Sequence, residues 1–519
     1  MTGSQCLRPT PTVWPLFAVA AATMVVALNA ASRPALADGG YYSGALGARA
    51  AGRAGAFSAR ADDPTALAYN PARLTELGEP AGVVWMFGNR LSHNAYGFTR
   101  APTLDWGHAP NDMAPTVRFA EARNRQPWQP LEPLLAVASK LGLRDWGFAL
   151  GAFAAPGTSR LDFPLDGGQR YLMVSREAII LNYAAGAAWK HRNRFGVGLT
   201  LEWIHVPRLD YALVIDGTPF AGAANPVSST LDLLASTAGS DPFTLNAILG
   251  AWYRPVPWLE LALAGQVVPA SIVTHSQLSV QPLDPSMGPV ALTRDGRPAD
   301  DVSVTLPLPL RAGVGARYRR LDPEPAVVLI QEGPFEIFDL ELDLEYESWS
   351  RVRQFTLDTR GLVATLQGAD VDLGQIAVAK RWRDTLTVKL GGDYAALPGR
   401  WTLRAGAFYQ TAVAPGGYAN VDFPGGQMLG GSLGTSLVLG RWEIAIAYQV
   451  RLQPRFTVAE GDARVYQQVP ASACQPPYTD SIACNPHYLG QPAPAVNAGS
   501  YAATSQALSL ALLYRYRSR

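Results

Sequence analysis

The sequence predicts an all-β fold, a transmembrane antiparallel β-barrel of about 14 strands. Three observations predict it. Apolar and polar residues alternate along most of the chain, charged residues make up only 16% of the 519 residues, and short connections between strands alternate with long ones. Soluble domains carry nearer ~25% charged residues. The net charge of +1 comes without a basic block, so the composition does not indicate a nucleic-acid partner.

The first 37 residues have the pattern of a cleaved export signal. Arg8 lies in a short positive region, an apolar stretch runs from Trp14 to Ala31, and Ala35-Leu36-Ala37 is a small-residue cleavage site. An uncleaved anchor is the alternative, but the apolar stretch is barely long enough to span a bilayer. No later run reaches about 18 apolar residues, so the mature chain cannot span as helices. Export without helical spans indicates the outer membrane of a Gram-negative cell, or its periplasm.

Strand candidates follow residue 80, each bounded by turn residues. Several connections are very short, as at 191–194 and 440–441, whereas those at 215–243, 283–301 and 460–501 are long. Short turns on one side and long loops on the other are typical of outer-membrane barrels. Strands are expected at residues 82–98, 133–139, 146–163, 171–190, 195–214, 244–253, 259–282, 302–319, 335–357, 374–395, 401–413, 427–439, 442–459 and 502–516. Aromatic residues at strand ends predict an interfacial girdle: Trp146, Trp203, Trp401, Trp442, Tyr514 and Tyr516.

The strand at 335–357 has the sharpest two-faced pattern. From Phe338 to Glu347, an apolar residue alternates with an acidic one. The neighbouring strands carry arginines on their polar faces, and opposite charges on adjacent strands stabilise a sheet by roughly 0.2–1 kcal/mol per pair. We therefore expect a charge ladder on the lumenal wall; a solvated face of a soluble sheet is the alternative. Its predicted residues are Arg311, Arg317, Asp339, Glu341, Asp343, Glu345, Arg381 and Arg383.

Four segments near the N-terminus, 44–47, 52–56, 61–64 and 70–72, are followed in order by Glu345–Ser350 and Trp401–Gly406. Together these motifs resemble the FadL family, outer-membrane transporters of long-chain fatty acids and other hydrophobic compounds. Glu345–Ser350 resembles the family's Tyr-x-x-Trp-Ser pattern, and Trp401–Gly406 resembles another family strand. The match runs in order from about residue 40 to the end, but the chain continues past Tyr516 where the family commonly ends in an aromatic residue. The four N-terminal segments resemble the family's hatch.

The resemblance implies that residues 38–80 form a hatch that plugs the lumen of a barrel made by residues 81–519. Asn70-Pro71-Ala72 then belongs to the plug rather than to an ordinary turn. Asp62 and Asp63 are either surface charges or partners of lumenal arginines.

In the family, extracellular loops catch the ligand in a hydrophobic groove, and a kink in the third strand releases it sideways above the hatch. We expect this kink at Pro156-Gly157, because proline lacks the ladder donor and glycine weakens strand pairing. The expected capture groove lies in loops 215–243 and 283–301, with the loops' own small core as the alternative. Its residues are Phe220, Leu231, Leu233, Leu234, Phe243, Leu283 and Met287.

The remaining motifs concern a disulfide, a metal site and a hydrolase site. Cys6 leaves with the signal, and Cys474 and Cys484 are an even pair in an exported loop, which predicts a disulfide. The scattered histidines give no metal or triad signature, so no metal or cofactor is expected. Gly430–Gly434 matches the hydrolase G-x-S-x-G pattern, but its serine sits inside a predicted strand rather than at an elbow.

We therefore expect a passive transporter, not an enzyme, that is monomeric in the outer membrane among lipid and lipopolysaccharide. Its expected partner is a hydrophobic small molecule, with long-chain fatty acids as the first choice. A structural or adhesive barrel whose loops bind partners is the second hypothesis, and an outer-membrane lipid hydrolase is the third. The sequence does not distinguish a fatty acid from an aromatic hydrocarbon or another lipid.

Overall fold

The computed structural model describes residues 45–78, 81–104, 115–155, 158–216, 227, 232–322, 335–423, 425–467 and 495–516. Among these residues, no helix has the length and apolarity needed to cross a bilayer. The predicted signal peptide and residues 38–44 lie outside the described residues. So do six residues to which the sequence assigned a role: Pro156, Gly157, Phe220, Leu231, Cys474 and Cys484.

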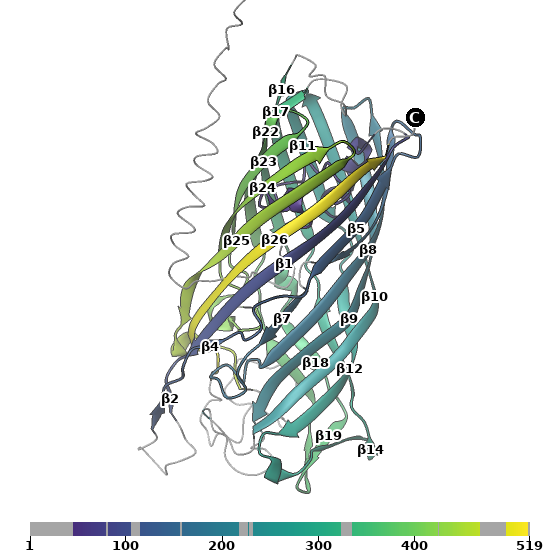
Figure 1. Ribbon diagram of the computed structural model, residues 1–519. Coiled ribbons are helices and arrows are strands. Elements are labelled where there is room, and N and C mark those ends of the chain that lie inside the picture. Colours follow the sequence, from purple (N-terminus) through teal and green to yellow (C-terminus); the bar gives the residue numbers. More distant parts are fainter. Residues whose placement is uncertain are drawn as a thin grey trace, which may run out of the picture.

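The strands close into one antiparallel barrel of 14 strands, which confirms the predicted fold class. Its wall is tall and its strands are strongly tilted (Figure 1). The first and last strands close it, with Val83 opposite Tyr516 and Arg100 opposite Gly499. Most strands are continuous: β1 Val83–Arg100, β5 Glu132–Ser139, β8 Ser175–His191, β9 Phe195–Asp216, β10 Asp232–Val256, β23 Trp401–Gln410, β24 Met428–Leu439, β25 Trp442–Val458 and β26 Gly499–Tyr516.

The remaining strands are each divided into two pieces by a short break. These breaks lie at a similar height in the wall, because neighbouring pieces pair on both sides of them. The divided strands are β6 Trp146–Ala154 with β7 Ser159–Asp162, β11 Leu259–Gln266 with β12 Ser271–Pro282, β15 Asp301–Pro307 with β16 Arg311–Asp322, β17 Phe335–Glu347 with β18 Gln354–Asp358, and β21 Gln375–Ala379 with β22 Thr385–Leu397.

The two ends of the barrel differ. At one, the turn end, connections such as 192–194 and 440–441 are short, although β16 and β17 are joined there by residues 323–334. The other, the loop end, carries short extra elements: β2 Thr103–Leu104, β3 Thr116–Val117, β4 Ala122–Arg123, η5 Gly416–Tyr418 and η6 Glu460–Asp462. A small sheet also lies there, in the order β14 Arg297–Pro298, β13 Ala291–Arg294, β19 Leu362–Leu366 and β20 Ala369–Asp372. Figure 1 shows β14 and β19 at this end.

The predicted loop boundaries are partly wrong, because the strands continue further toward the loop end than the sequence suggested. The loop expected at 215–243 is shorter, since β9 runs to Asp216 and β10 begins at Asp232. The segment 283–301 contains η3 Pro285–Met287 together with β13 and β14.

Exposed apolar side chains form an outer belt on the half of the barrel nearer the turn end. We take this belt as the part that spans the membrane, since lipid-facing residues of such barrels are apolar and flanked by aromatic girdles. The row near the turn end includes Trp85, Trp146, Trp258, Tyr318, Trp401, Trp442 and Tyr516. The row nearer the loop end includes Tyr183, Trp203, Phe243, Tyr346 and Tyr409.

Residues 45–78, the inner segment, lie inside the barrel in its turn-end half, as the purple ribbon in Figure 1 shows. The segment forms α2 Ala48–Ala51, α3 Ala66–Tyr69 and η1 Pro71–Glu76. Glycines in the wall let its backbone approach closely. A Cβ on Gly406 would lie 2.3 Å from the carbonyl carbon of Arg53, and one on Gly250 would lie 2.1 Å from Oδ1 of Asn70. The absence of side chains there lets the inner segment pack directly on the strands.

Candidate functional site

One buried arginine fixes the inner segment to the wall. The guanidinium of Arg53 is fully buried and donates to Asp339 at 2.9 Å, to Glu341 at 2.8 Å and to Asp393 at 2.6 Å. Its Nε also donates to the carbonyl of Ala56 at 2.8 Å. Buried charges are tolerated only when they are paired and hydrogen-bonded. The sequence motif Gly52-Arg53-Ala54-Gly55 therefore places a cation beside acidic residues of two adjacent strands, β17 and β22.

The acidic face of β17 points into the barrel, but its main partner is the inner segment. One oxygen of Asp343 accepts from the backbone N–H groups of Phe57 and Ser58, both at 3.0 Å. Glu341 accepts from the N–H of Ala59 at 2.6 Å. These carboxylates satisfy backbone donors of a segment that has little secondary structure of its own.

The predicted ladder between adjacent strands is present only in part. Arg317 donates to Asp339 at 2.5 Å and to Glu260 at 2.7 Å. Arg311 lies opposite Glu347 in the register of β16 and β17, and Glu345 binds Lys389 at 2.8 Å.

The assignment of Arg381 and Arg383 to this ladder is wrong. Both lie in the break between β21 and β22, where their side chains are exposed while Lys380 and Trp382 are buried. The break ends the regular alternation, so the face predicted from β22 does not extend back to these residues.

The predicted hatch motif links parts of the inner segment and the wall. Oδ1 of Asn70 accepts from the N–H of Ala72 at 3.2 Å, and its Nδ2 donates to the carbonyls of Ser58 at 3.1 Å and Ala251 at 3.0 Å. Pro71 occupies the start of η1, where a missing N–H costs nothing. The carbonyl of Ala72 accepts from Trp252 at 3.1 Å.

Asp62 and Asp63 are both inside the barrel but have different surroundings. Asp62 binds Arg49 at 2.7 Å and Arg60 at 3.1 Å. Burial alone would raise the pKa of Asp62, yet these arginines hold it well below its ordinary value. Asp63 accepts from the N–H of Thr65 at 2.9 Å, and burial raises its pKa although Arg49 opposes the shift. Asp62 is therefore one of the paired acids of the inner segment.

Along β9, the lumen is divided into three levels. Nearest the inner segment lies a polar chamber with about 1130 Å³ of empty space, lined by Glu202 of β9 and by Arg311, Glu345 and Lys389 among others. Further toward the loop end, buried apolar residues form a layer at the height of the strand breaks. Its buried members include Ala155, Ile204, Val206, Ile272, Leu308, Trp349, Val352, Trp382 and Phe423.

Beyond this layer lies an apolar cavity with about 1060 Å³ of empty space. It is enclosed mainly by the loop-end parts of strands and not by loops. Among the described residues, Arg176 is the one charged residue of its lining. The remaining lining includes Ile180, Leu209, Tyr211, Leu213, Ile215, Ala235, Thr237, Leu278, Val304, Leu306, Phe355, Leu357, Ile376 and Val378.

This cavity exists because β9 changes the face that it turns inward. From Phe195 to Trp203 the odd-numbered residues are exposed on the outer belt, whereas the odd-numbered residues from Leu209 to Ile215 line the cavity. The register with neighbouring strands shifts between Ile179 and Leu181 of β8 and around Asp241 of β10. A one-residue shift turns every following side chain to the other face. Alternation predicts the strand but not this switch.

Basic groups gather where the cavity meets the apolar layer. The guanidinium of Arg176 lies 3.9 Å from the ring centre of Phe423, and donates to the carbonyl of Asp422 and to Ser159 Oγ, both at 2.8 Å. The ammonium of Lys380 is fully buried and binds the Asp422 carboxylate at 2.5 Å and 2.6 Å. Two cations therefore bind Asp422 beside an apolar space, Lys380 at the carboxylate and Arg176 at the backbone carbonyl. None of these three residues stood out in the sequence, because they come from distant segments without a common motif.

The predicted capture residues that the structure describes do not line this cavity. Leu233 and Leu234 belong to β10, and Leu233 is buried in a cluster beneath the small sheet. Leu283 and Met287 are partly buried at the loop end. Phe243 is wrong as a capture residue: it is 62% exposed on the outer belt and packs against Trp203. For Leu233, Leu234 and Phe243, the physical reason is that they are residues of β10 whose faces were assigned as if they lay in a loop.

The third strand of the barrel is interrupted as its sequence suggested. β6 ends at Ala154 and β7 begins at Ser159, on either side of Pro156 and Gly157. The side chain of Thr158 takes the place of backbone hydrogen bonds between the strands. Its hydroxyl donates to the carbonyl of Ile180 and accepts from the N–H of Ile180, both at 3.1 Å. The interruption lies at the height of the apolar layer, to which Ala155 belongs.

The hydrolase-like motif lies in a regular strand. Ser432 is buried within β24, and its Oγ accepts from the N–H of Ala54 at 2.7 Å. This serine is thus part of the contact with the inner segment. In the described part of the chain, no group of three or more His, Cys, Asp or Glu residues could hold a metal ion.

A family model described as "Outer membrane protein transport protein (OMPP1/FadL/TodX)" matches residues 323–469. This match confirms the resemblance that the sequence motifs indicated. No curated protein sequence matches the chain.

Solved structures of this type have the same fold. The structure of a Pseudomonas aeruginosa FadL homologue has a TM-score of 0.67 at 15% identity, covering 92% of this chain and 99% of that one. The Ralstonia pickettii toluene transporter TbuX has a TM-score of 0.53 at 16% identity, with coverage of 92% and 99%. The Pseudomonas putida toluene transporter TodX has a TM-score of 0.55 at 13% identity, with coverage of 92% and 100%.

Proposed function

We propose that this chain, whose fold and sequence resemblance are those of the FadL family, is an outer-membrane transporter that carries hydrophobic compounds passively. We further propose that its ligands are long-chain fatty acids, although two of the similar structures are described as toluene transporters. No catalytic step and no cofactor form part of this proposal.

The observation that carries the proposal is the apolar cavity with a cationic end. Its strand-built lining suits an acyl chain, whose burial is favourable by roughly 0.8 kcal/mol per methylene. Arg176 lines the cavity, with Lys380 and Asp422 directly beside it. A carboxylate headgroup would be attracted by the net positive charge of this group of three residues, whereas a neutral hydrocarbon would not.

The levels of the lumen also favour a sideways route. A ligand that passes the apolar layer meets the polar chamber and then the inner segment, which we propose to be the hatch. An acyl chain gains nothing from entering a polar chamber. The interruption of the third strand lies at the height of the apolar layer, so we propose that the ligand leaves there, near Gly157, and enters the outer leaflet.

Replacing Arg176 by glutamine tests the headgroup part of this proposal. Purified protein in detergent is titrated with palmitic acid and with hexadecanol, which share a chain but differ in charge, and binding is followed by native mass spectrometry. Arg208→Gln is the matched control, because Arg208 is exposed on the outer wall and paired with Asp210. We expect the variant to lose about tenfold in affinity for the acid, worth about 1.4 kcal/mol, and little for the alcohol.

Equal binding of acid and alcohol by the unchanged protein would contradict the fatty-acid assignment. The aromatic side chains of Tyr211, Phe355 and Phe423 around the cavity favour a monoaromatic hydrocarbon as the second candidate. Tighter binding of toluene than of palmitic acid would establish that candidate in its place.

A further inference from the structure

Two adjacent strand breaks bring four arginines together in the wall. Residues 348–353 separate β17 from β18, and residues 380–384 separate β21 from β22. The backbone N–H groups of Lys380 and Arg381 both donate to the carbonyl of Arg353 at 2.8 Å. The N–H of Trp382 donates to the carbonyl of Val352 at 3.2 Å. The two breaks are therefore hydrogen-bonded to each other and form one surface.

The alternation of side chains turns the arginines outward. Val352, Lys380 and Trp382 are buried on the lumenal side, where Val352 and Trp382 belong to the apolar layer. Their neighbours Arg353, Arg381 and Arg383 are exposed, and Arg351 is partly exposed. The alternation of burial holds although Arg351 lies in the short 3-10 helix η4 Trp349–Arg351 and Arg381 has a left-handed backbone conformation, with φ of 43°. We call Arg351, Arg353, Arg381 and Arg383 the outer arginine cluster.

The two breaks are strongly positive. They contain four arginines and the buried Lys380 beside one acid, Asp384, a net charge of +4. The carboxylate of Asp384 already accepts from the hydroxyl of Tyr346 at 2.6 Å and from the N–H of Ser350 at 2.8 Å. Arg381 also lies 5.5 Å from the ring centre of Tyr418.

Two exposed arginines at the loop end are each paired with an acid. Arg123 binds Glu121 at 2.6 Å, and Arg208 binds Asp210 at 2.6 Å. These two residues provide a comparison for the cluster, because each belongs to a local ion pair.

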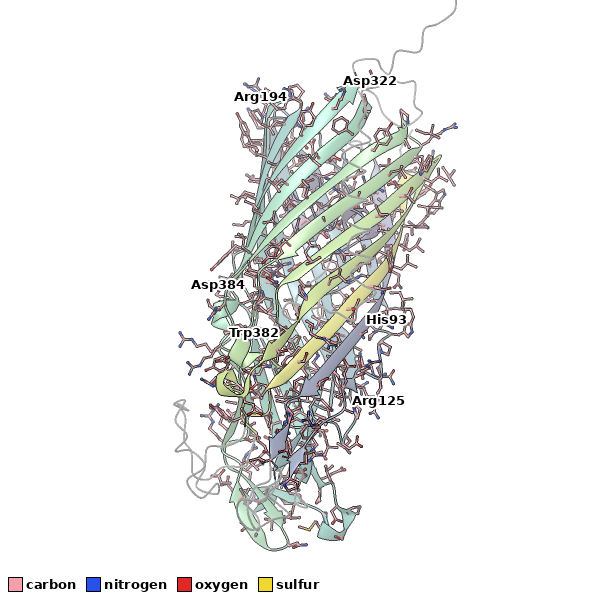
Figure 2. The ribbon with its side chains drawn as sticks, turned by 90° about the vertical axis from the view of Figure 1, so that its left-hand side faces the viewer. His93, Arg125, Arg194, Asp322, Trp382 and Asp384 are labelled. Carbon is pink, nitrogen blue, oxygen red and sulfur yellow. The ribbon has the colours of Figure 1, made fainter. Side chains whose placement is uncertain are left out.

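The cluster lies directly beyond the outer belt, on its loop-end side. Tyr346 is 45% exposed and belongs to the aromatic row that marks this border of the belt. Leu344 and Leu386, which are exposed on the adjoining strands, lie on the belt side of it. Figure 2 labels Trp382 and Asp384 at the outer edge of the barrel, between its two ends. Lipid headgroups lie at the height of such an aromatic row, with the acyl chains beside the apolar belt.

We propose that the outer arginine cluster binds the phosphate groups of a phosphorylated lipid in the leaflet on the loop side. Guanidinium groups bind phosphate oxygens in a bidentate manner and remain charged at any physiological pH. The belt below the cluster contacts the acyl chains of the same lipid, which favours a lipid over an acidic peptide or a free anion. The breaks thus contribute Trp349, Val352 and Trp382 to the apolar layer and also provide a headgroup site outside.

Lipid binding to the purified protein tests this proposal without any transport step. The protein is titrated in a nonionic detergent with lipid A, a diphosphorylated glycolipid, and with phosphatidylcholine, and native mass spectrometry measures the bound fraction. The test variant is Arg353→Gln with Arg383→Gln. The control is Arg123→Gln with Arg208→Gln, which removes two exposed arginines that are paired with acids. Heat-modifiable migration on a gel verifies that each variant is a folded barrel.

We expect the test variant to bind lipid A at least tenfold more weakly, and the control to stay within twofold of the unchanged protein. Phosphatidylcholine should bind weakly and equally to all three. Replacing Arg353 and Arg383 by lysine should restore part of the affinity, because charge returns without the bidentate geometry. Equal lipid A binding by the test variant would overturn the proposal, and so would an equal loss in the control. Complete displacement of the lipid by millimolar inorganic phosphate would show an anion site that does not depend on a lipid.

Discussion

Arg53→Met should release the inner segment from the wall while the barrel stays folded. Arg53 is fully buried and binds three carboxylates from β17 and β22. Methionine fills a similar volume without charge. The variant therefore removes the attraction and leaves the carboxylates in place.

The free-energy cost of Arg53→Met depends on which carboxylates lose their partner. Asp339 keeps Arg317 at 2.5 Å, and Asp393 keeps Arg404 at 2.9 Å. Glu341 loses its ion pair at 2.8 Å and keeps backbone donors. Breaking one buried pair costs about 3–5 kcal/mol. Because two of the three carboxylates keep another arginine, we take the lower part of this range, about 3–4 kcal/mol. We therefore expect the docking equilibrium of the inner segment to shift by about two to three orders of magnitude.

Hydrogen exchange followed by mass spectrometry measures this shift. Amides of residues 45–60 should exchange about 100 to 1000 times faster in Arg53→Met, since their protection depends on docking. Amides of the barrel strands should not change. Adding Glu341→Gln should recover part of the protection, because the unpaired charge is removed. Unchanged exchange in residues 45–60 of Arg53→Met would refute the view that buried charge fixes the inner segment.

Three further predictions concern other parts of the chain. Gly406→Ala should loosen the inner segment in the same exchange experiment, because its Cβ would lie 2.3 Å from the carbonyl carbon of Arg53. Gly313→Ala is the control and should not loosen it, because the nearest atom to its Cβ would be 3.5 Å away. Equal effects of the two substitutions would argue against close packing of the inner segment on the wall. Gly157→Trp should reduce uptake of labelled fatty acid with surface binding preserved, and normal uptake by a correctly inserted variant would reject the sideways route. Cys474 and Cys484 should appear as a linked peptide in a non-reducing digest, and two free thiols would disprove that disulfide.

The fold could be predicted from the sequence because alternation is a local property of each strand. The lipid-facing residues of β9 from Phe195 to Trp203 and the acidic face of β17 are both visible in it. The groups that the acidic residues of β17 bind could not be predicted in the same way. Asp343 binds backbone groups of Phe57 and Ser58, a contact across 286 positions of sequence for which alternation gives no signal.

The candidate cavity could not be predicted for a related reason. Its lining is apolar on the lumenal side of the strands, the opposite of what a membrane barrel pattern suggests. The register shifts near Leu181 and Asp241 accompany this inversion, and β9 interrupts its odd-numbered apolar series there with the buried Ile204 and Val206 before the series resumes at Leu209. Arg381 and Arg383 were placed in the lumen for the converse reason, since nothing in the sequence marked a break at 380–384. A proline next to a glycine did mark the interruption between β6 and β7.

Uptake of radiolabelled oleate by cells that express a cavity-filled variant tests the central claim most directly. Ala235→Trp places an indole in the apolar cavity, where Ala235 is buried, whereas Ala185→Trp places one on the exposed outer face of β8. With equal amounts of folded protein in the membrane, we predict that Ala235→Trp abolishes most of the transporter-dependent uptake and that Ala185→Trp retains it. Full uptake by Ala235→Trp would contradict the claim that the ligand passes through this cavity.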